Sequence, residues 1–169
     1  MTRLKLRLFG AALLMALVAS TALAASAPQS KSPDATMEQF LQAMRQRDKE
    51  KAKPKLKAAF DWPALAQANF PDFQKQPEAK RQALITQVQS IFTAVFAMGK
   101  DADGMKMSKA NIKGSEATVV LLRKDKDGKM LPTTEFKLHK MKDGTWLIFS
   151  VGKAEQPTEK KPESTEPAH

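Results

Sequence analysis

Four consecutive stretches decide the fold: MKMSKANI (Met105–Ile112), EATVVLLR (Glu116–Arg123), MLPTTEFKLHK (Met130–Lys140) and TWLIFSV (Thr145–Val151). Each is rich in β-branched, aromatic or alternating apolar residues, a composition typical of strands. The three segments between them are short and contain Gly114, Gly128 and Gly144, as tight turns do. Because parallel strands need a longer crossover, these strands must be antiparallel neighbours. We therefore expect a four-stranded antiparallel meander.

The residues before this sheet are predicted to be helical. Ser32 or Asp34 can cap a first helix, whose apolar residues recur at helical spacing from Met37 to Met44 until Pro54 interrupts the pattern. Asp61-Trp62-Pro63 begins a short helix, and the longest helix runs from Pro77 to about Met98. Helices followed by a meander predict an α+β domain with the helices packed on one face of the sheet. The long helix has a wide apolar face: Leu84, Ile85, Val88, Ile91, Phe92, Val95 and Phe96.

The two ends of the chain do not look like parts of the domain. Residues 1–27 resemble a secretion signal, with three basic residues before an apolar run of about a dozen and small residues for cleavage near 24–27. The run is short for a membrane span, although an uncleaved anchor is the alternative. Residues 28–32 form a linker and 33–152 the domain. Residues 153–169 alternate Pro, Glu and Lys and are predicted to be disordered.

Composition argues against catalysis. The chain of 169 residues has no cysteine and two histidines, so thiolate nucleophiles, Cys-ligated zinc and iron–sulfur sites are excluded. His139 lies in a predicted strand beside lysines and is expected to be an exposed strand residue rather than a catalytic base. The segments 101–104 and 125–128 resemble the start of a calcium loop but lack its distal Glu, so they are expected to be turns. We predict no enzymatic activity, no cofactor and no metal site.

The chain is strongly basic, with a formal charge of +10 at pH 7. A basic surface attracts anions, either nucleic acid or acidic lipid headgroups, and export favours the lipid. The bland alternative is a solvated helix face that keeps the protein soluble. No nucleic acid partner is expected. The cations proposed for an anionic headgroup or a membrane surface are Arg45, Arg47, Lys49, Lys51, Lys53, Lys55 and Lys57.

A set of large apolar residues lies where the long helix should face the sheet. One interpretation is an ordinary filled core. The other is a cleft between helix and sheet that takes acyl chains, since each buried methylene contributes about 0.8 kcal/mol. Both interpretations remain open from the sequence. The residues expected to line such a cleft are Phe92, Val95, Phe96, Leu121, Phe136, Leu138, Trp146 and Ile148.

Several segments resemble the MlaC (toluene-tolerance) family. They are Phe60–Ala66, Gln76–Gln82, Phe92–Phe96, Thr134–Lys140 and Asp143–Ile148, and the order of signal, helices and meander agrees as well. The similarity spans about residues 37–151 and lacks the closing C-terminal helix of the family. It implies an MlaC-like, NTF2-like cone fold and a monomeric periplasmic carrier that moves phospholipid between envelope membranes. It also implies docking on membrane-bound lipid-transport complexes, without catalysis.

The sequence therefore supports two functional hypotheses. In the first, the protein binds phospholipid or another apolar ligand in the periplasm. In the second, the same apolar residues form a closed core and the protein is an envelope interaction module that docks a partner without a ligand.

Overall fold

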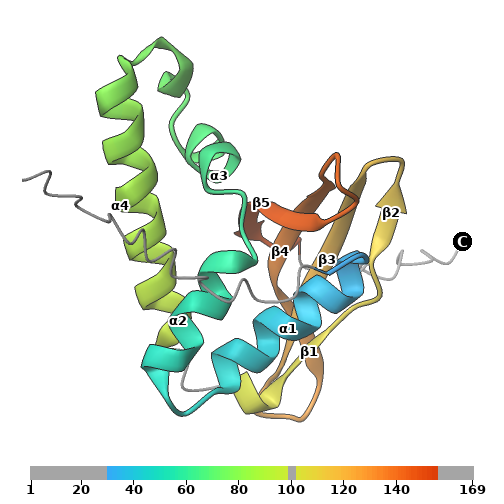
Figure 1. Cartoon of the computed structure of the whole chain (residues 1–169). Coiled ribbons are helices and arrows are strands. Elements are labelled where there is room, and N and C mark those ends of the chain that lie inside the picture. Colours follow the sequence, from blue (N-terminus) through green and yellow to red (C-terminus); the bar gives the residue numbers. More distant parts are fainter. Residues whose placement is uncertain (1–29, 99–101, 156–169) are drawn as a thin grey trace, which may run out of the picture.

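The computed structural model describes residues 30–98 and 102–155, which form an α+β domain. The predicted signal sequence and residues 156–169 of the predicted tail lie outside the described residues. Figure 1 shows α1 crossing in front of the sheet and α4 standing to one side, with α2 and α3 between them. The helices are α1 (Pro33–Arg45), α2 (Lys49–Ala58), α3 (Trp62–Asn69) and α4 (Glu78–Ala97), with short 3-10 turns η1 (Phe73–Lys75) and η2 (Ala102–Gly104).

The sheet is antiparallel and has one more strand than predicted. Its strands are β1 (Met105–Met107), β2 (Asn111–Lys113), β3 (Glu116–Lys124), β4 (Met130–Lys140) and β5 (Trp146–Lys153). The order is β1-β3-β4-β5, and β2 also pairs with β3. Connections β2-β3, β3-β4 and β4-β5 join antiparallel neighbours, so the predicted meander is confirmed over these strands.

The first predicted strand is divided at residues 108–110. There the Ser108 hydroxyl oxygen accepts the N–H of Val120 at 2.9 Å, and the Asp34 carboxylate accepts the N–H of Ala110 at 2.9 Å. These side chains replace part of the regular ladder, which explains why the strand breaks. The last predicted strand also differs, because β5 extends to Lys153 and the N–H of Ala154 donates to the carbonyl of Thr133. The domain therefore continues slightly past its predicted end at residue 152.

The helix starts follow the predicted capping residues. Ser32 caps α1 and Asp61 caps α3, each accepting a backbone N–H within the first turn. The outcome differs around Pro54, because a new helix capped by Asp48 begins at Lys49 and continues through the proline. Pro54 thus lies inside α2 instead of ending a helix. Predicted turns are confirmed at Gly128 and Gly144, whose positive φ angles of 84° and 85° favour glycine.

One face of the sheet is covered by helices. Along β3, Ala117, Val119 and Leu121 are buried on that face, while the residues between them are half-buried on the other. Phe60, which links α2 to α3, forms a parallel bridge with Ile148 of β5. The N–H of Asp61 donates to the carbonyl of Ile148, and the N–H of Ile148 donates to the carbonyl of Ala59. The helical half is thus joined to the sheet through backbone hydrogen bonds as well as apolar packing.

Candidate functional surface

The residues predicted to line a lipid cleft lie mostly in the core. Phe136, Leu138 and Ile148 are fully buried, and Leu121 and Trp146 are buried as well. They belong to one apolar cluster with Met37, Phe40 and Leu65, and half-buried Phe92 and Phe96 pack against it. These side chains contact one another where the open cleft was expected. Their burial agrees with the filled-core interpretation that the sequence left open.

Aromatic rings from four parts of the chain account for this filling. The ring of Phe40 on α1 lies 4.9 Å from that of Phe96 on α4 and 5.3 Å from that of Phe136 on β4, both edge to face. Phe60 lies 5.6 Å from Phe40 and stacks on Trp62 at 4.8 Å. Such pairs stabilise a core beyond the area they bury. The helices and the sheet therefore meet through side chains at the place where acyl chains were expected.

Val95 is the exception among the eight predicted residues. It is 55% exposed and is not part of the packed cluster. Ile91, one turn earlier, is 51% exposed, and Met98, nearly one turn later, is 66% exposed. Their spacing of four and three residues places them in one row along α4. The predicted wide apolar face of this helix is therefore divided into a packed part and a row open to solvent.

The predicted basic run occupies the end of α1 and most of α2. Arg45 has a structural role, because its guanidinium donates to the carbonyls of Ala102 and Met105 at 3.1 and 2.8 Å. Lys51 and Lys53 form ion pairs with Asp48 and Glu50. The remaining four are exposed and have no ion-pair partner within residues 30–98 and 102–155: Arg47, Lys49, Lys55 and Lys57.

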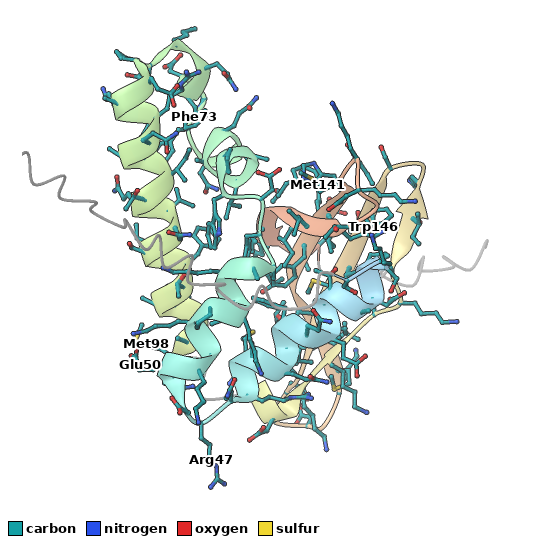
Figure 2. The ribbon with its side chains drawn as sticks, viewed as in Figure 1. Arg47, Glu50, Phe73, Met98, Met141 and Trp146 are labelled. Carbon is teal, nitrogen blue, oxygen red and sulfur yellow. The ribbon has the colours of Figure 1, made fainter. Side chains whose placement is uncertain are left out.

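The cations and the apolar row lie on neighbouring elements. Helix α2 packs against α4. In Figure 2, Met98 at the end of α4 is drawn near Glu50 at the start of α2, and Arg47 lies farther down in the same view. Most of the predicted basic run therefore belongs to a helix that packs against the helix carrying the exposed apolar row.

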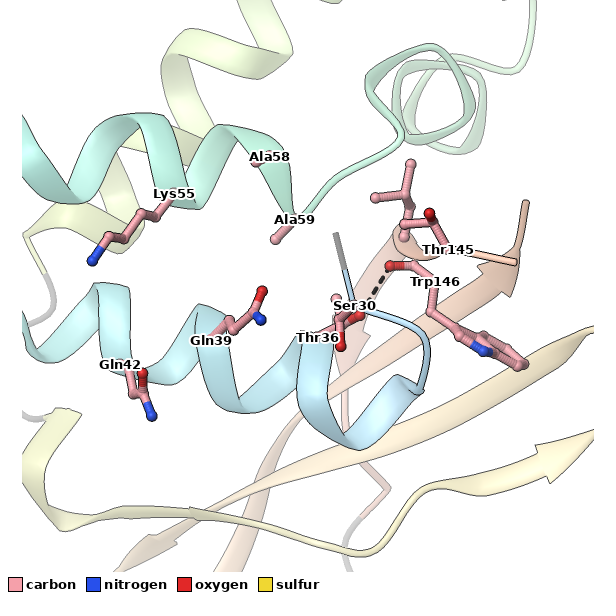
Figure 3. A pocket seen from close by; sticks show the side chains of 10 residues that line it. Ser30, Thr36, Gln39, Gln42, Lys55, Ala58, Ala59, Thr145 and Trp146 are labelled. Carbon is pink, nitrogen blue, oxygen red and sulfur yellow. Dashed lines mark hydrogen bonds between the residues drawn. The ribbon is translucent and has the colours of Figure 1, made fainter. Parts of the chain in front are cut away.

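A hollow of about 270 Å³ lies between α1, α2 and the start of β5 (Figure 3). Trp146 is the one predicted cleft residue on its wall, and Lys55 is the one predicted cation. This volume is near the lower end of the 300–1,000 Å³ typical of small-molecule sites, so it cannot hold both chains of a phospholipid. The lining residues are Ser30, Thr36, Gln39, Gln42, Lys55, Ala58, Ala59, Thr145, Trp146 and Leu147.

His139 is less exposed than the sequence suggested. Its side chain is 29% exposed, and its Nε2 lies 2.9 Å from Oδ2 of Asp61, whose side chain is 16% exposed. The imidazole also stacks on the ring of Phe149 at 5.0 Å. This pair joins β4 to the start of α3, so the position of His139 is explained by a structural contact between the two halves of the domain.

In the described part of the chain, no three His, Asp or Glu side chains come together in a way that could hold a metal ion. None of the helices in residues 30–98 and 102–155 combines the length and apolar character needed to cross a bilayer.

Comparison with known proteins gives no relative: neither a family model nor a curated protein sequence matches this chain. The resemblance to the MlaC family therefore stays a prediction.

Sequence reasoning missed two features of this surface. The Asp61–His139 contact joins residues 78 positions apart, and no local pattern connects them. The exposed row on α4 was included in a single wide apolar face, because periodicity shows which residues share a side of a helix but not how far the packing extends.

Proposed function

We propose that the protein is a non-catalytic, exported protein of the cell envelope that binds the surface of anionic phospholipid membranes. The row Ile91, Val95 and Met98 enters the headgroup boundary. The free cations Arg47, just before α2, and Lys49 and Lys57, on α2, contact the headgroups. The proposal keeps phospholipid as the ligand and the periplasm as the location. It moves the contact from the interior of the domain to its surface.

The exposed row is the observation that carries the proposal. Five large apolar side chains are strongly exposed in the described residues, and three of them form this row. Single exposed apolar residues are common and need no explanation, but a row along one helix is a typical contact surface. Apolar and basic side chains acting together are also a recurrent device for contact with a membrane interface, and here the basic residues come from α2, which packs against α4.

The C-terminal segment of the chain is not suited to covering this row. Residues 156–169 contain no apolar residue larger than alanine or proline. They could bury little apolar area against α4, so an outside partner is the better occupant.

Charge favours an anionic partner over a second copy of the chain. The full chain has a formal charge of +10, and removal of the predicted signal with Arg3, Lys5 and Arg7 leaves +7 on the exported protein. Two copies with this charge repel each other, and the same charge attracts an acidic surface. Near an anionic membrane, each lysine or arginine contributes about 1 kcal/mol. Arg47, Lys49 and Lys57 are exposed, and no residue that the structure describes forms an ion pair with them.

Vesicle sedimentation tests the proposal. The purified protein is mixed with vesicles of phosphatidylglycerol or of phosphatidylcholine at low and high salt. We expect it to sediment with phosphatidylglycerol, to be released in part by salt, and to remain in solution with phosphatidylcholine. Equal recovery from the two lipids, or none from either, would contradict the proposal and favour the protein-docking alternative.

Carriage of phospholipid inside the domain is tested separately. Solvent extraction of the purified protein, followed by mass spectrometry, shows whether phospholipid leaves the envelope with it. Because the aromatic cluster fills the interior, we expect less than one phospholipid per protein chain. A stoichiometric amount of two-chain lipid would show that the core opens, and would restore the carrier hypothesis.

A further inference from the structure

The hollow between α1, α2 and β5 supports an inference that is independent of the exposed row on α4. We propose that it binds a small single-chain anion, with the charged group at Lys55 and the apolar chain along Ala58, Ala59 and Leu147. The ligand class is a short alkyl chain with one carboxylate or phosphate. This site goes beyond the proposed membrane contact, which does not require it.

The charge of the hollow selects an anion. Lys55 is the one charged residue among those that line it, and no aspartate or glutamate shares the wall. Lys51 and Lys53 on the same helix have carboxylate partners, whereas Lys55 has none in the described ranges. A second hollow, beside Arg45 and Arg47, is also lined by Asp103, so its wall carries both positive and negative charge.

The hollow has one charged end, at Lys55, and uncharged residues along the rest of its wall. Figure 3 shows Lys55 reaching from α2 at one end and Trp146 at the other, with Gln39 pointing from α1 into the space below Ala59. The amide of Gln39 can donate N–H to an anion, as can that of Gln42 on the same wall. Ala58 and Ala59 have small side chains, which leave the space between the two helices open.

The wall near β5 is held in place by hydrogen bonds. The hydroxyl of Thr36 donates to the carbonyl of Trp146 at 3.0 Å, and the N–H of Trp146 donates to the carbonyl of Ser30 at 3.1 Å. Thr36, Thr145 and Trp146 are all buried. A wall of this kind is formed before the ligand arrives, which lowers the ordering cost of binding.

The volume limits the ligand to one chain. A hollow of about 270 Å³ is too small for two acyl chains, while a short alkyl anion fits. Each methylene that packs along Ala58, Ala59 and Leu147 should tighten binding about four-fold until the space is filled.

Calorimetric titration with octanoate, octyl phosphate and the neutral analogue octanol tests the site. We expect saturable binding of an anion and at least about ten-fold weaker binding of octanol. Tighter octanoate assigns a carboxylate ligand, and tighter octyl phosphate assigns a phosphate. Octanol binding as tightly as both anions, or no saturable binding of any of the three, would overturn the proposal.

Two variants place the ligand in the hollow. Lys55→Gln should weaken binding of the anion about five-fold, whereas Lys113→Gln, at an exposed lysine of the sheet half that lies outside the hollow, should not change it. Ala58→Phe should fill the space and abolish binding, while Ala68→Phe, at an exposed position of α3, should not. If the two Lys→Gln variants weakened anion binding equally, the proposed site would be wrong, even if Ala58→Phe failed to fold.

Discussion

His139 Nε2 lies 2.9 Å from Asp61 Oδ2, and this contact ties the sheet to the start of α3. Asp61 serves the junction in three ways. Its Oδ1 accepts the N–H of Ala64 as the helix cap, its Oδ2 accepts from His139, and its own N–H donates to Ile148. The residue therefore couples helix formation to docking of that helix on β4 and β5.

Replacing Asp61 should destabilise the domain more than removing a simple cap. Asp61→Ala loses both side-chain contacts, and we expect a loss of about 2–3 kcal/mol in the free energy of unfolding. His139→Ala should cost about 1 kcal/mol, and the double variant should show a coupling of about 1 kcal/mol. Urea denaturation followed by tryptophan fluorescence measures all three values.

Asp48→Ala is the matched control for this comparison. Asp48 also caps a helix by accepting the N–H groups of Glu50 and Lys51, but its remaining contact is an exposed ion pair with Lys51. It should cost only about 1 kcal/mol. Equal losses for Asp61→Ala and Asp48→Ala would mean that the His139 contact contributes nothing to stability.

The filled interior makes a second prediction about stability. Phe40→Ala removes a fully buried ring that contacts Phe60, Phe96 and Phe136, and should cost about 3–5 kcal/mol. Val95→Ala, on the exposed row, should change stability by less than about 0.5 kcal/mol. A small effect of Phe40→Ala would indicate a loosely packed interior, as a lipid cavity requires.

The loop between β4 and β5 should respond to acid. The backbone N–H of Thr145 donates to the Asp143 carboxylate at 2.9 Å, and this bond lowers the pKa of that carboxyl below its ordinary value. The charged form therefore stabilises the folded state above the ordinary aspartate range. That contribution is lost as the pH falls through the lowered pKa.

Asp143→Ala should consequently be less stable than the parent at neutral pH, and the difference should disappear in strong acid. Unfolding measured from pH 7 down to pH 2 tests this, with Asp127→Ala as a turn aspartate whose carboxylate accepts no hydrogen bond from a described residue. A difference that persists unchanged at the lowest pH would contradict the assigned carboxylate contact.

The free cations on and just before α2 should set the salt dependence of membrane binding. The triple variant Arg47→Gln, Lys49→Gln, Lys57→Gln should lose about 3 kcal/mol of affinity for phosphatidylglycerol vesicles at low salt. Lys106→Gln, Lys113→Gln, Lys126→Gln removes equal charge from exposed residues of the sheet half and should lose much less. Equal losses would show that net charge, and not this surface, drives the attraction.

Much of the fold could be predicted because its signals are local. Asp61-Trp62-Pro63 combines a cap and an early proline, and Gly128 and Gly144 supply the positive φ angles of two turns. The division of the first strand could not be predicted, because the N–H of Ala110 donates to the carboxylate of Asp34, which is 76 residues away in the sequence. The prediction at Pro54 was wrong for a different reason: the proline lies at an exposed position inside α2, a helix that Asp48 caps at its start.

The candidate surface was harder to predict than the fold. Apolar periodicity identified Phe96, Phe136 and Val95 alike, but only tertiary packing shows that Phe96 and Phe136 contact Phe40 while Val95 faces solvent. The number of basic residues likewise could not distinguish Arg45, whose guanidinium donates to two backbone carbonyls, from Lys57, which has no ion-pair partner in the described residues. Burial and partnership depend on contacts between distant segments, which a single sequence does not reveal.

The position of Val95 at a membrane tests the central claim most directly. The chain contains no cysteine, so Val95→Cys and Ile112→Cys each accept one nitroxide label at a strongly exposed apolar site. With phosphatidylglycerol vesicles, we predict that the label at residue 95 becomes accessible to oxygen and protected from a water-soluble nickel complex. The label at residue 112 should remain in water. Continued access of the nickel complex to residue 95 in the vesicle-bound protein would contradict the account.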